Sequence, residues 1–67
     1  MKIVLNNRED IINAEKITLS DLIKIKNFTF RLLVTKVNGK LVKRYERDTV
    51  FIKNGDNVAV LHMISGG

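Results

Sequence analysis

The sequence predicts a single α+β domain, a mixed sheet of four to five strands with one helix packed across one face. The chain has 67 residues, of which 45% are hydrophobic and 28% are charged, and it contains neither cysteine nor proline. This composition fits one folded domain, because a hydrophobic core needs most of a chain this short. Asn38-Gly39 and Asn54-Gly55 separate short apolar runs, which is typical of strands joined by tight turns. Residues 18–26 place apolar side chains at helical spacing.

The chain is expected to begin with two strands joined by a tight turn. Residues 1–5 are rich in β-branched side chains and predict the first strand. Asn6-Asn7 predicts the turn, because asparagine tolerates a positive φ. Residues 10–14 are expected to return as the second strand.

The helix is predicted to begin directly after Thr18. The Thr18 hydroxyl can accept a hydrogen bond from an amide of the first turn, and Asp21 lies near the positive end of the helix dipole. The apolar residues at helical spacing are assigned to the core: Leu19, Leu22 and Ile23.

Short strands and turns are expected to follow an apolar connector at residues 28–30. The sequence predicts a strand over 32–37, a turn at Asn38-Gly39, a returning strand at 41–42, a polar link with one helical turn at 45–48, an apolar run at 49–52, a turn at 54–56 and a last strand over 58–64.

The order of these elements restricts the topology. A helix that follows the first hairpin must pack across the sheet, since neither element can bury its apolar face alone. If the last strand lies beside the first and parallel to it, the helix forms the crossover that parallel neighbours need. This arrangement is the β-grasp, or ubiquitin-like, fold. We expect the domain to span residues 1–64 and a flexible tail to span residues 65–67.

Catalysis by this chain alone is not expected. It has one histidine, and neither Gly39 nor Gly55 belongs to a Gly-rich phosphate loop. His62 has no plausible Asp or Ser partner nearby in the sequence, so a structural role is favoured over a catalytic one. We therefore predict no catalytic residue, no metal site and no bound cofactor. Residues 1–5 are too short for a signal-peptide core and no apolar run could cross a bilayer, so a cytoplasmic protein without membrane partners is expected.

The net charge of +5 lies in one central region. Residues 31–53 hold seven basic and two acidic side chains, whereas charges in the rest of the chain balance. Such a region could bind nucleic acid, act as a solvated face that keeps the protein soluble, or dock an acidic partner protein. Nucleic acid is the least favoured partner, because the nearby aromatic residues, Tyr45 and Phe51, form no stacking pattern. The other two interpretations stay open.

The sequence closes on Ser65-Gly66-Gly67. One interpretation is a frayed terminus. The other is a functional tail: glycine has no Cβ, so the backbone of Gly66 and Gly67 could enter a narrow channel and place its carboxylate in a partner's active site. A free carboxylate is a poor acyl donor and needs activation, for example as a mixed anhydride with AMP. Because the chain has no phosphate loop, another protein would have to handle the ATP.

Three stretches in this order resemble the sulfur carrier protein of thiamine biosynthesis, the ThiS family: Val37-Asn38-Gly39-Lys40, Asn54-Gly55-Asp56, and residues 58–67 with their terminal Gly-Gly. The resemblance implies a β-grasp fold and a carrier that is not itself an enzyme. It also implies that a ThiF-like enzyme, using ATP and Mg, adenylates Gly67. Sulfur from a donor protein would displace AMP and leave a thiocarboxylate, which a ThiG-like thiazole synthase would consume.

Two other functions remain as alternatives. The small subunit of molybdopterin synthase uses the same thiocarboxylate chemistry on a β-grasp domain, although those chains usually run longer. A basic β-grasp module that binds RNA or a protein would leave the Gly-Gly end without a function.

A partner-binding surface is expected beside the tail. Val58, Val60 and His62 share one face of the last strand. The other face is formed by Ala59, Leu61 and Met63. If the first set faces the helix, the second forms an exposed apolar stripe suited to docking, unless another element covers it. The expected basic rim around the stripe consists of Lys36, Lys40, Lys43 and Arg44.

Overall fold

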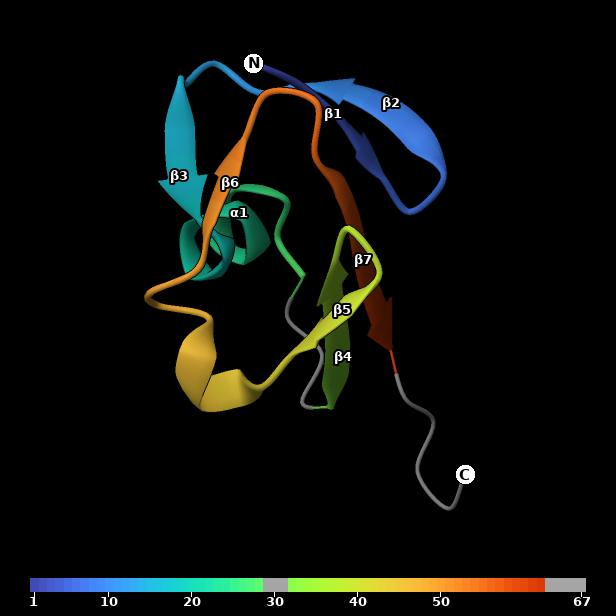
Figure 1. Ribbon diagram of the computed structural model, residues 1–67, viewed down its shortest axis with the longest axis vertical. Coiled ribbons are helices and arrows are strands. Elements are labelled where there is room, and N and C mark those ends of the chain that lie inside the picture. Colours follow the sequence, from blue (N-terminus) through green and yellow to red (C-terminus); the bar gives the residue numbers. More distant parts are fainter. Residues whose placement is uncertain (29–31, 63–67) are drawn as a thin grey trace.

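A computed structural model describes residues 1–28 and 32–62 of the chain. The elements follow in the order β1 (Lys2–Leu5), β2 (Arg8–Ile11), β3 (Lys16–Thr18), α1 (Leu19–Ile25), β4 (Leu33–Val37), β5 (Lys40–Val42), the 3-10 helix η1 (Arg44–Glu46), β6 (Phe51–Lys53) and β7 (Asn57–His62). Five strands form one sheet in the order β2-β1-β7-β4-β5, and β3 pairs with β6 in a second, two-stranded sheet (Figure 1). No helix in these two described ranges is long and apolar enough to span a membrane.

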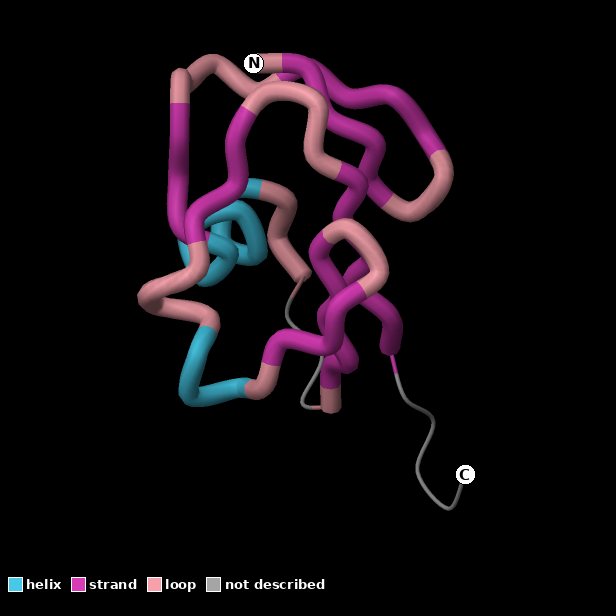
Figure 2. The backbone as a smooth tube through the Cα atoms, viewed as in Figure 1, coloured by secondary structure: helices cyan, strands magenta, loops and turns pink. Residues whose placement is uncertain are grey.

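The first and last strands lie side by side in the middle of the larger sheet. Val4 is opposite Asn57 and Leu5 is opposite Val58, and the two strands run parallel. The other neighbours in this sheet, β1–β2, β4–β5 and β4–β7, are antiparallel. In Figure 2 the helix and the two-stranded sheet lie at the left of the view and the five-stranded sheet at the right. The predicted parallel pairing and helical crossover are confirmed.

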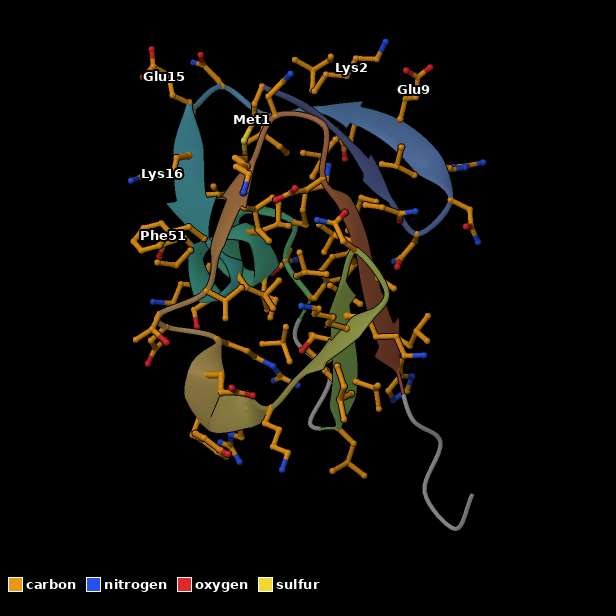
Figure 3. The ribbon with its side chains drawn as sticks, viewed as in Figure 1. Met1, Lys2, Glu9, Glu15, Lys16 and Phe51 are labelled. Atoms are coloured by element: carbon orange, nitrogen blue, oxygen red, sulfur yellow. The ribbon has the colours of Figure 1, made fainter. Side chains whose placement is uncertain are left out.

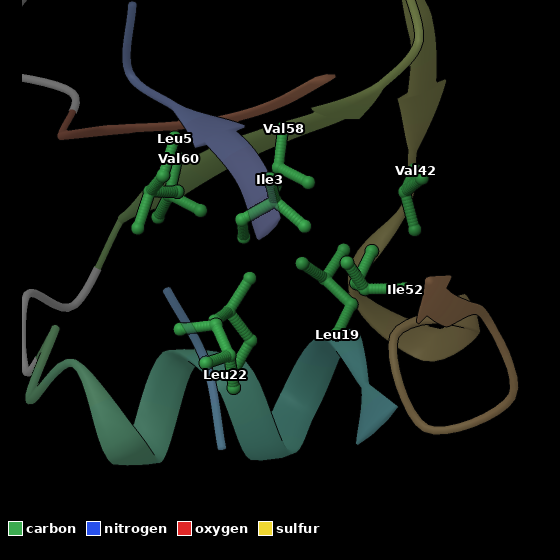
Figure 4. Packing of buried hydrophobic residues seen from close by; sticks show 9 residues of the cluster. Ile3, Leu5, Leu19, Leu22, Val42, Ile52, Val58 and Val60 are labelled. Atoms are coloured by element: carbon green, nitrogen blue, oxygen red, sulfur yellow. The ribbon is translucent and has the colours of Figure 1, made fainter. Parts of the chain in front are cut away.

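The hydrophobic core lies between α1 and one face of the larger sheet. Leu19 and Leu22 of the helix have no exposed surface, as expected from their spacing. In Figure 4 they point toward Ile3 and Val58 of the sheet and toward Ile52 of β6. Ile23 and Phe28 are half-buried and pack against this cluster. The rest of the apolar connector, residues 29–30, lies outside the described residues.

The helix begins where the sequence predicts. The Thr18 Oγ1 accepts a hydrogen bond of 3.0 Å from the Asp21 amide, which satisfies one of the amides left free in the first turn. Asp21 is the acidic residue of that turn. At the other end Lys26 caps the helix, and its Nζ lies 2.6 Å from the Asp10 carboxylate of β2. The helix is thereby tied to the sheet at its C-terminal end as well as by its buried face.

The turns predicted at Asn6-Asn7 and at Asn38-Gly39 are present, and their central residues have a left-handed backbone. Asn6 and Asn7 have φ values of 51° and 66°, and Asn38 and Gly39 have 52° and 82°. Positive φ at both central residues matches the right-handed twist of the strands that such a turn joins. These two turns set the register of β1 with β2 and of β4 with β5.

Several predicted boundaries were wrong. The second strand is Arg8–Ile11 rather than residues 10–14, because a two-residue turn places Arg8 directly opposite Leu5. The chain then leaves the sheet at Ile12, whose side chain is buried in the core. The 3-10 turn begins at Arg44, one residue before the predicted link, and the apolar run predicted at 49–52 forms a strand only at Phe51–Lys53. The strands β4, β5 and β7 each begin one residue away from their predicted starts.

One strand was not predicted at all. β3 forms three antiparallel pairs with β6, with Ile17 opposite Ile52. The described part of the last strand ends at His62. Its predicted continuation to residue 64 lies outside the described residues.

Candidate functional site on the open face of the sheet

The face of the large sheet opposite the helix carries an apolar surface. Side chains alternate across a strand, so directly opposite residues of antiparallel strands share a face. Lys36 is opposite Leu41 on one side and Ala59 on the other, and Val34 is opposite Leu61. The structure therefore brings five side chains of three strands together, and we call them the open-face patch: Val34, Lys36, Leu41, Ala59 and Leu61.

The two faces of β7 differ in burial as the alternation predicts. Val58 and Val60 are 0% and 4% exposed and belong to the core, whereas Leu61 is 48% exposed. His62, predicted on the core-facing side, is an exposed residue at the end of the strand. Met63, predicted to extend the apolar stripe, lies outside the described residues. Within residues 32–62 the predicted exposure of the apolar stripe holds for Leu61, whereas Ala59 is half-buried.

Two patch members were not predicted. Leu41 is 59% exposed although it is strongly apolar, and Val34 is half-buried. Both are placed beside β7 residues by strand pairing, which the sequence alone does not give. A shallow hollow of about 380 Å³ adjoins the patch at Leu41. It is lined by Val37, Asn38, Lys40, Leu41, Val42, Glu46 and Val50.

The basic side chains near the patch have no acidic partners in the part of the chain that the structure describes. Its two salt bridges, Lys2–Glu9 and Lys26–Asp10, both involve the β1–β2 hairpin. Figure 3 labels Lys2 at the start of β1 and Glu9 on β2. The hydrogen bond from Lys2 to Glu9 raises the pKa of Lys2 above the ordinary value. The exposed cations of β4, β5 and the start of η1 remain unpaired: Lys36, Lys40, Lys43 and Arg44. Four exposed cations without an acidic partner in the described residues thus lie in or near the open-face patch.

Arg47 braces the strands that carry this charge. Its Nε donates to the Thr35 Oγ1 at 3.1 Å, and its Nη2 donates to the Leu33 carbonyl at 2.7 Å. Thr35 is fully buried and donates in turn to the Val42 carbonyl at 2.7 Å. Burial lowers the pKa of the Arg47 guanidinium from its ordinary value, and the nearby Arg44 charge adds to the effect. Arg47 therefore stabilises β4 and β5 rather than belonging to the free cations.

A buried carboxylate fixes the start of β7. Asp56 is 5% exposed, and its two oxygens accept from the Asn38 side-chain amide at 3.0 Å and from the Lys53 amide at 2.9 Å. The Asn38 Oδ1 accepts from the Asn57 amide at 2.8 Å. The turns at Asn38-Gly39 and at residues 54–56 are thus bonded to one another at the point where β7 enters the sheet.

Asn6 contacts β7 at a later point in that strand. Its Nδ2 donates to the Val60 carbonyl at 3.1 Å, and the Val60 amide donates to its Oδ1 at 2.8 Å. The two residues are 54 positions apart in the sequence. The sequence analysis assigned Asn6 only to a turn and missed this contact. An asparagine in a turn gives no indication in the sequence of which distant backbone group its side chain will bond.

The predicted reactive residue, Gly67, and the predicted tail residues, Ser65 and Gly66, lie outside the described residues. Among residues 1–28 and 32–62 no cluster of three or more His, Cys, Asp or Glu side chains could hold a metal ion.

A single helix across a mixed five-stranded sheet, with the first and last strands parallel at its centre, defines the class of ubiquitin-like β-grasp domains. A family model described as the ThiS family matches residues 2–67. The chain therefore belongs to the ThiS family.

Solved structures with the same fold support this assignment at the level of architecture. The crystal structure of a thiamine biosynthesis protein (ThiS) from Geobacter metallireducens matches with a TM-score of 0.91 and 23% sequence identity, and the match covers 100% of both chains. The solution NMR structure of a thiamine biosynthesis protein from Geobacter metallireducens matches with a TM-score of 0.80 and 23% identity, and covers 100% of this chain and 88% of that one. At this identity the likeness shows the fold alone. A search of curated proteins gave no match.

Proposed function

We propose that this protein is a sulfur carrier of thiamine biosynthesis, and that the C-terminal carboxylate of Gly67 is the group that carries the sulfur. The observation that carries the proposal is the family match, which extends through Gly67 on a β-grasp domain. In this proposal residues 1–64 form the recognised body and residues 65–67 form a flexible tail. The chain is the substrate of its partner enzymes, in the cytoplasm, and performs no catalysis itself.

The proposed chemistry has three steps. A carboxylate oxygen of Gly67 attacks the α-phosphorus of ATP and pyrophosphate leaves, which gives an acyl-adenylate. The terminal sulfur of a donor protein's persulfide then attacks the acyl carbon and AMP leaves, which gives an acyl disulfide. A thiol attacks the donor's sulfur in this disulfide, forms a new disulfide with it and releases the thiocarboxylate. A ThiG-like thiazole synthase takes the sulfur, and hydrolysis regenerates the carboxylate. ATP and Mg are bound by the ThiF-like enzyme, because no phosphate loop exists in this sequence.

We further propose that the open-face patch is where the partner enzymes dock. Leu41 and Leu61 are about half exposed beside Ala59, and apolar surface of this kind is depleted on proteins that bind nothing. Met63 would continue the stripe toward the tail. Lys36 and Lys40 would attract carboxylates of the partner and accelerate association.

Leu61→Asp is expected to raise the KM of adenylation at least about tenfold, because it places a charge in the centre of a desolvated interface. The fold should be retained, since Leu61 is 48% exposed. Ile25→Asp is the matched control: Ile25 is also an exposed aliphatic residue, at 59%, but it lies on the helix. Steady-state kinetics with the ThiF-like enzyme of the same organism measure both variants. Equal KM values for the two variants would place the docking surface elsewhere.

Reconstitution tests the proposed pathway. The protein is incubated with the ThiF-like enzyme, ATP, Mg and a sulfur donor, then offered separately to thiazole synthase and to the large subunit of molybdopterin synthase. We expect sulfur transfer to thiazole synthase. Transfer to the molybdopterin subunit alone would assign the chain to the other carrier class, and failure to form any thiocarboxylate would contradict both.

A further inference from the structure

Strand β7 is supported unequally along its two edges. On the β4 side the backbone pairing runs from Val58 through His62. On the β1 side it covers only Asn57 and Val58, because β1 turns away into the hairpin at Asn6-Asn7. The Asn6 amide still reaches the Val58 carbonyl, with a hydrogen bond of 2.9 Å. Beyond this point no backbone of β1 lies opposite β7.

The Asn6 side chain extends this ladder by one further step. Its amide group donates to the carbonyl of Val60 and accepts from the amide of the same residue, as a neighbouring strand would. Both bonds are within the normal range for N–H···O contacts. An Asp at position 6 could accept from the Val60 amide but could not donate to its carbonyl, and glycine could do neither.

The hairpin turn does not itself require this side chain. Asn6 and Asn7 have similar positive φ values, and glycine satisfies a turn of this kind at least as well as asparagine. No side-chain hydrogen bond of Asn7 occurs among the described residues, so the two turn positions differ in one respect. The Asn6 amide is bonded to the strand that leads to the C-terminus, and the Asn7 amide is not.

We propose that Asn6 is a positioning residue that fixes the direction in which β7 leaves the sheet, and thereby where the C-terminal segment is delivered in a partner's active site. This inference rests on the proposed function. Val60 lies two residues before the described end of β7 at His62, so a change of strand direction at Val60 is passed on to the residues that follow. Misplacement by about 1 Å at a reacting group can lower a rate by about 100-fold.

The test compares two glycine substitutions in the same turn. Asn6→Gly keeps the backbone conformation and removes the bonds to Val60, whereas Asn7→Gly makes the same chemical change without touching β7. With the ThiF-like enzyme, Asn6→Gly is expected to lower the kcat of adenylation about 10- to 100-fold and to change KM less than about twofold. KM should change little because the substitution alters the position of the C-terminal segment and not the surface by which the domain binds the enzyme. Asn7→Gly is expected to leave both constants near those of the unmodified protein.

Amide hydrogen exchange supplies the structural readout. We expect the Val60 amide to exchange faster in Asn6→Gly and unchanged in Asn7→Gly. Asn6→Asp, which keeps only the bond from the Val60 amide, serves if Asn6→Gly does not fold, and its kcat should also fall.

Two results would overturn the inference while leaving the proposed function intact. One is a normal kcat in the presence of faster Val60 exchange, which would make the contact purely structural. The other is a raised KM with an unchanged kcat, which would assign Asn6 to docking. If the unmodified protein is not adenylated at all, the proposed function fails, and the inference fails with it.

Discussion

Leu22→Ala is expected to lower the free energy of unfolding by about 3 kcal/mol, which is a large part of the total for a domain of this size. Leu22 has no exposed surface and projects from α1 into the cluster that contains Ile3 and Val58. Removing its isobutyl group leaves a cavity between the helix and the sheet, and a single-layer core of this kind has few other contacts to compensate. Urea unfolding followed by circular dichroism measures the change.

Ile25→Ala provides the matched control on the same helix. Ile25 is 59% exposed, so its replacement should change the free energy of unfolding by less than about 0.5 kcal/mol. Alanine also favours the helix slightly more than isoleucine does. Similar losses for the two variants would mean that α1 does not pack on the sheet as described.

Gly67→Ala is expected to slow adenylation at least about tenfold. The added Cβ would stand beside the reacting carboxylate and would need a wider channel in the partner's active site. A small misplacement of the reacting group also lowers the rate strongly. Pyrophosphate release by the ThiF-like enzyme measures the rate at saturating ATP. The KM should change less than for Leu61→Asp, since the body of the domain still docks.

The stability of Gly67→Ala separates a functional tail from a structural one. If residues 65–67 lie outside the core, thermal unfolding should match that of the unmodified protein, with a change below about 0.5 kcal/mol. A clear loss of stability would show that the terminus is part of the folded domain, and the proposed role of the tail would then be wrong.

Local chemistry was enough to predict the main elements. Thr18 begins the helix because a hydroxyl caps its first turn, and the turns at Asn6-Asn7 and Asn38-Gly39 form because these residues accept positive φ. The alternation on β7 placed Val58 and Val60 on the same face, and both are buried in the core. In each case the cause lies within a few residues of its effect.

The features that were missed depend on pairing across long separations. β3 is three residues long, too short for its polar–apolar alternation to predict a strand, and it is a strand because β6 pairs with it from far along the chain. Val34 and Leu41 join the open-face patch only through the register of β4 with its neighbours. The bonds of Asn6 to Val60 and of Arg47 to Leu33 connect side chains to distant backbone, for which a single sequence has no signal.

For the predicted site, the structure gives the positions of most predicted partner-binding residues but not their role. The structure places Lys36, Ala59 and Leu61 on one surface. Lys40, predicted beside them, is opposite Val37 at the start of β5 and belongs to the other side of the strand alternation. Their role in docking stays a prediction. The predicted reactive group, at Gly67, was inferred from the chemistry of an unhindered terminal carboxylate, and it too stays a prediction.

The mass of the C-terminal tryptic peptide tests the central claim most directly. Lys53 is the last basic residue, so trypsin releases a peptide that begins at Asn54 and contains Gly67. After incubation with the ThiF-like enzyme, ATP, Mg and a sulfur donor, we predict that this peptide gains the mass difference between one sulfur and one oxygen, at Gly67 and only when ATP is present. An unchanged peptide with an enzyme that is active on another carrier, or sulfur on any other residue, would contradict the account.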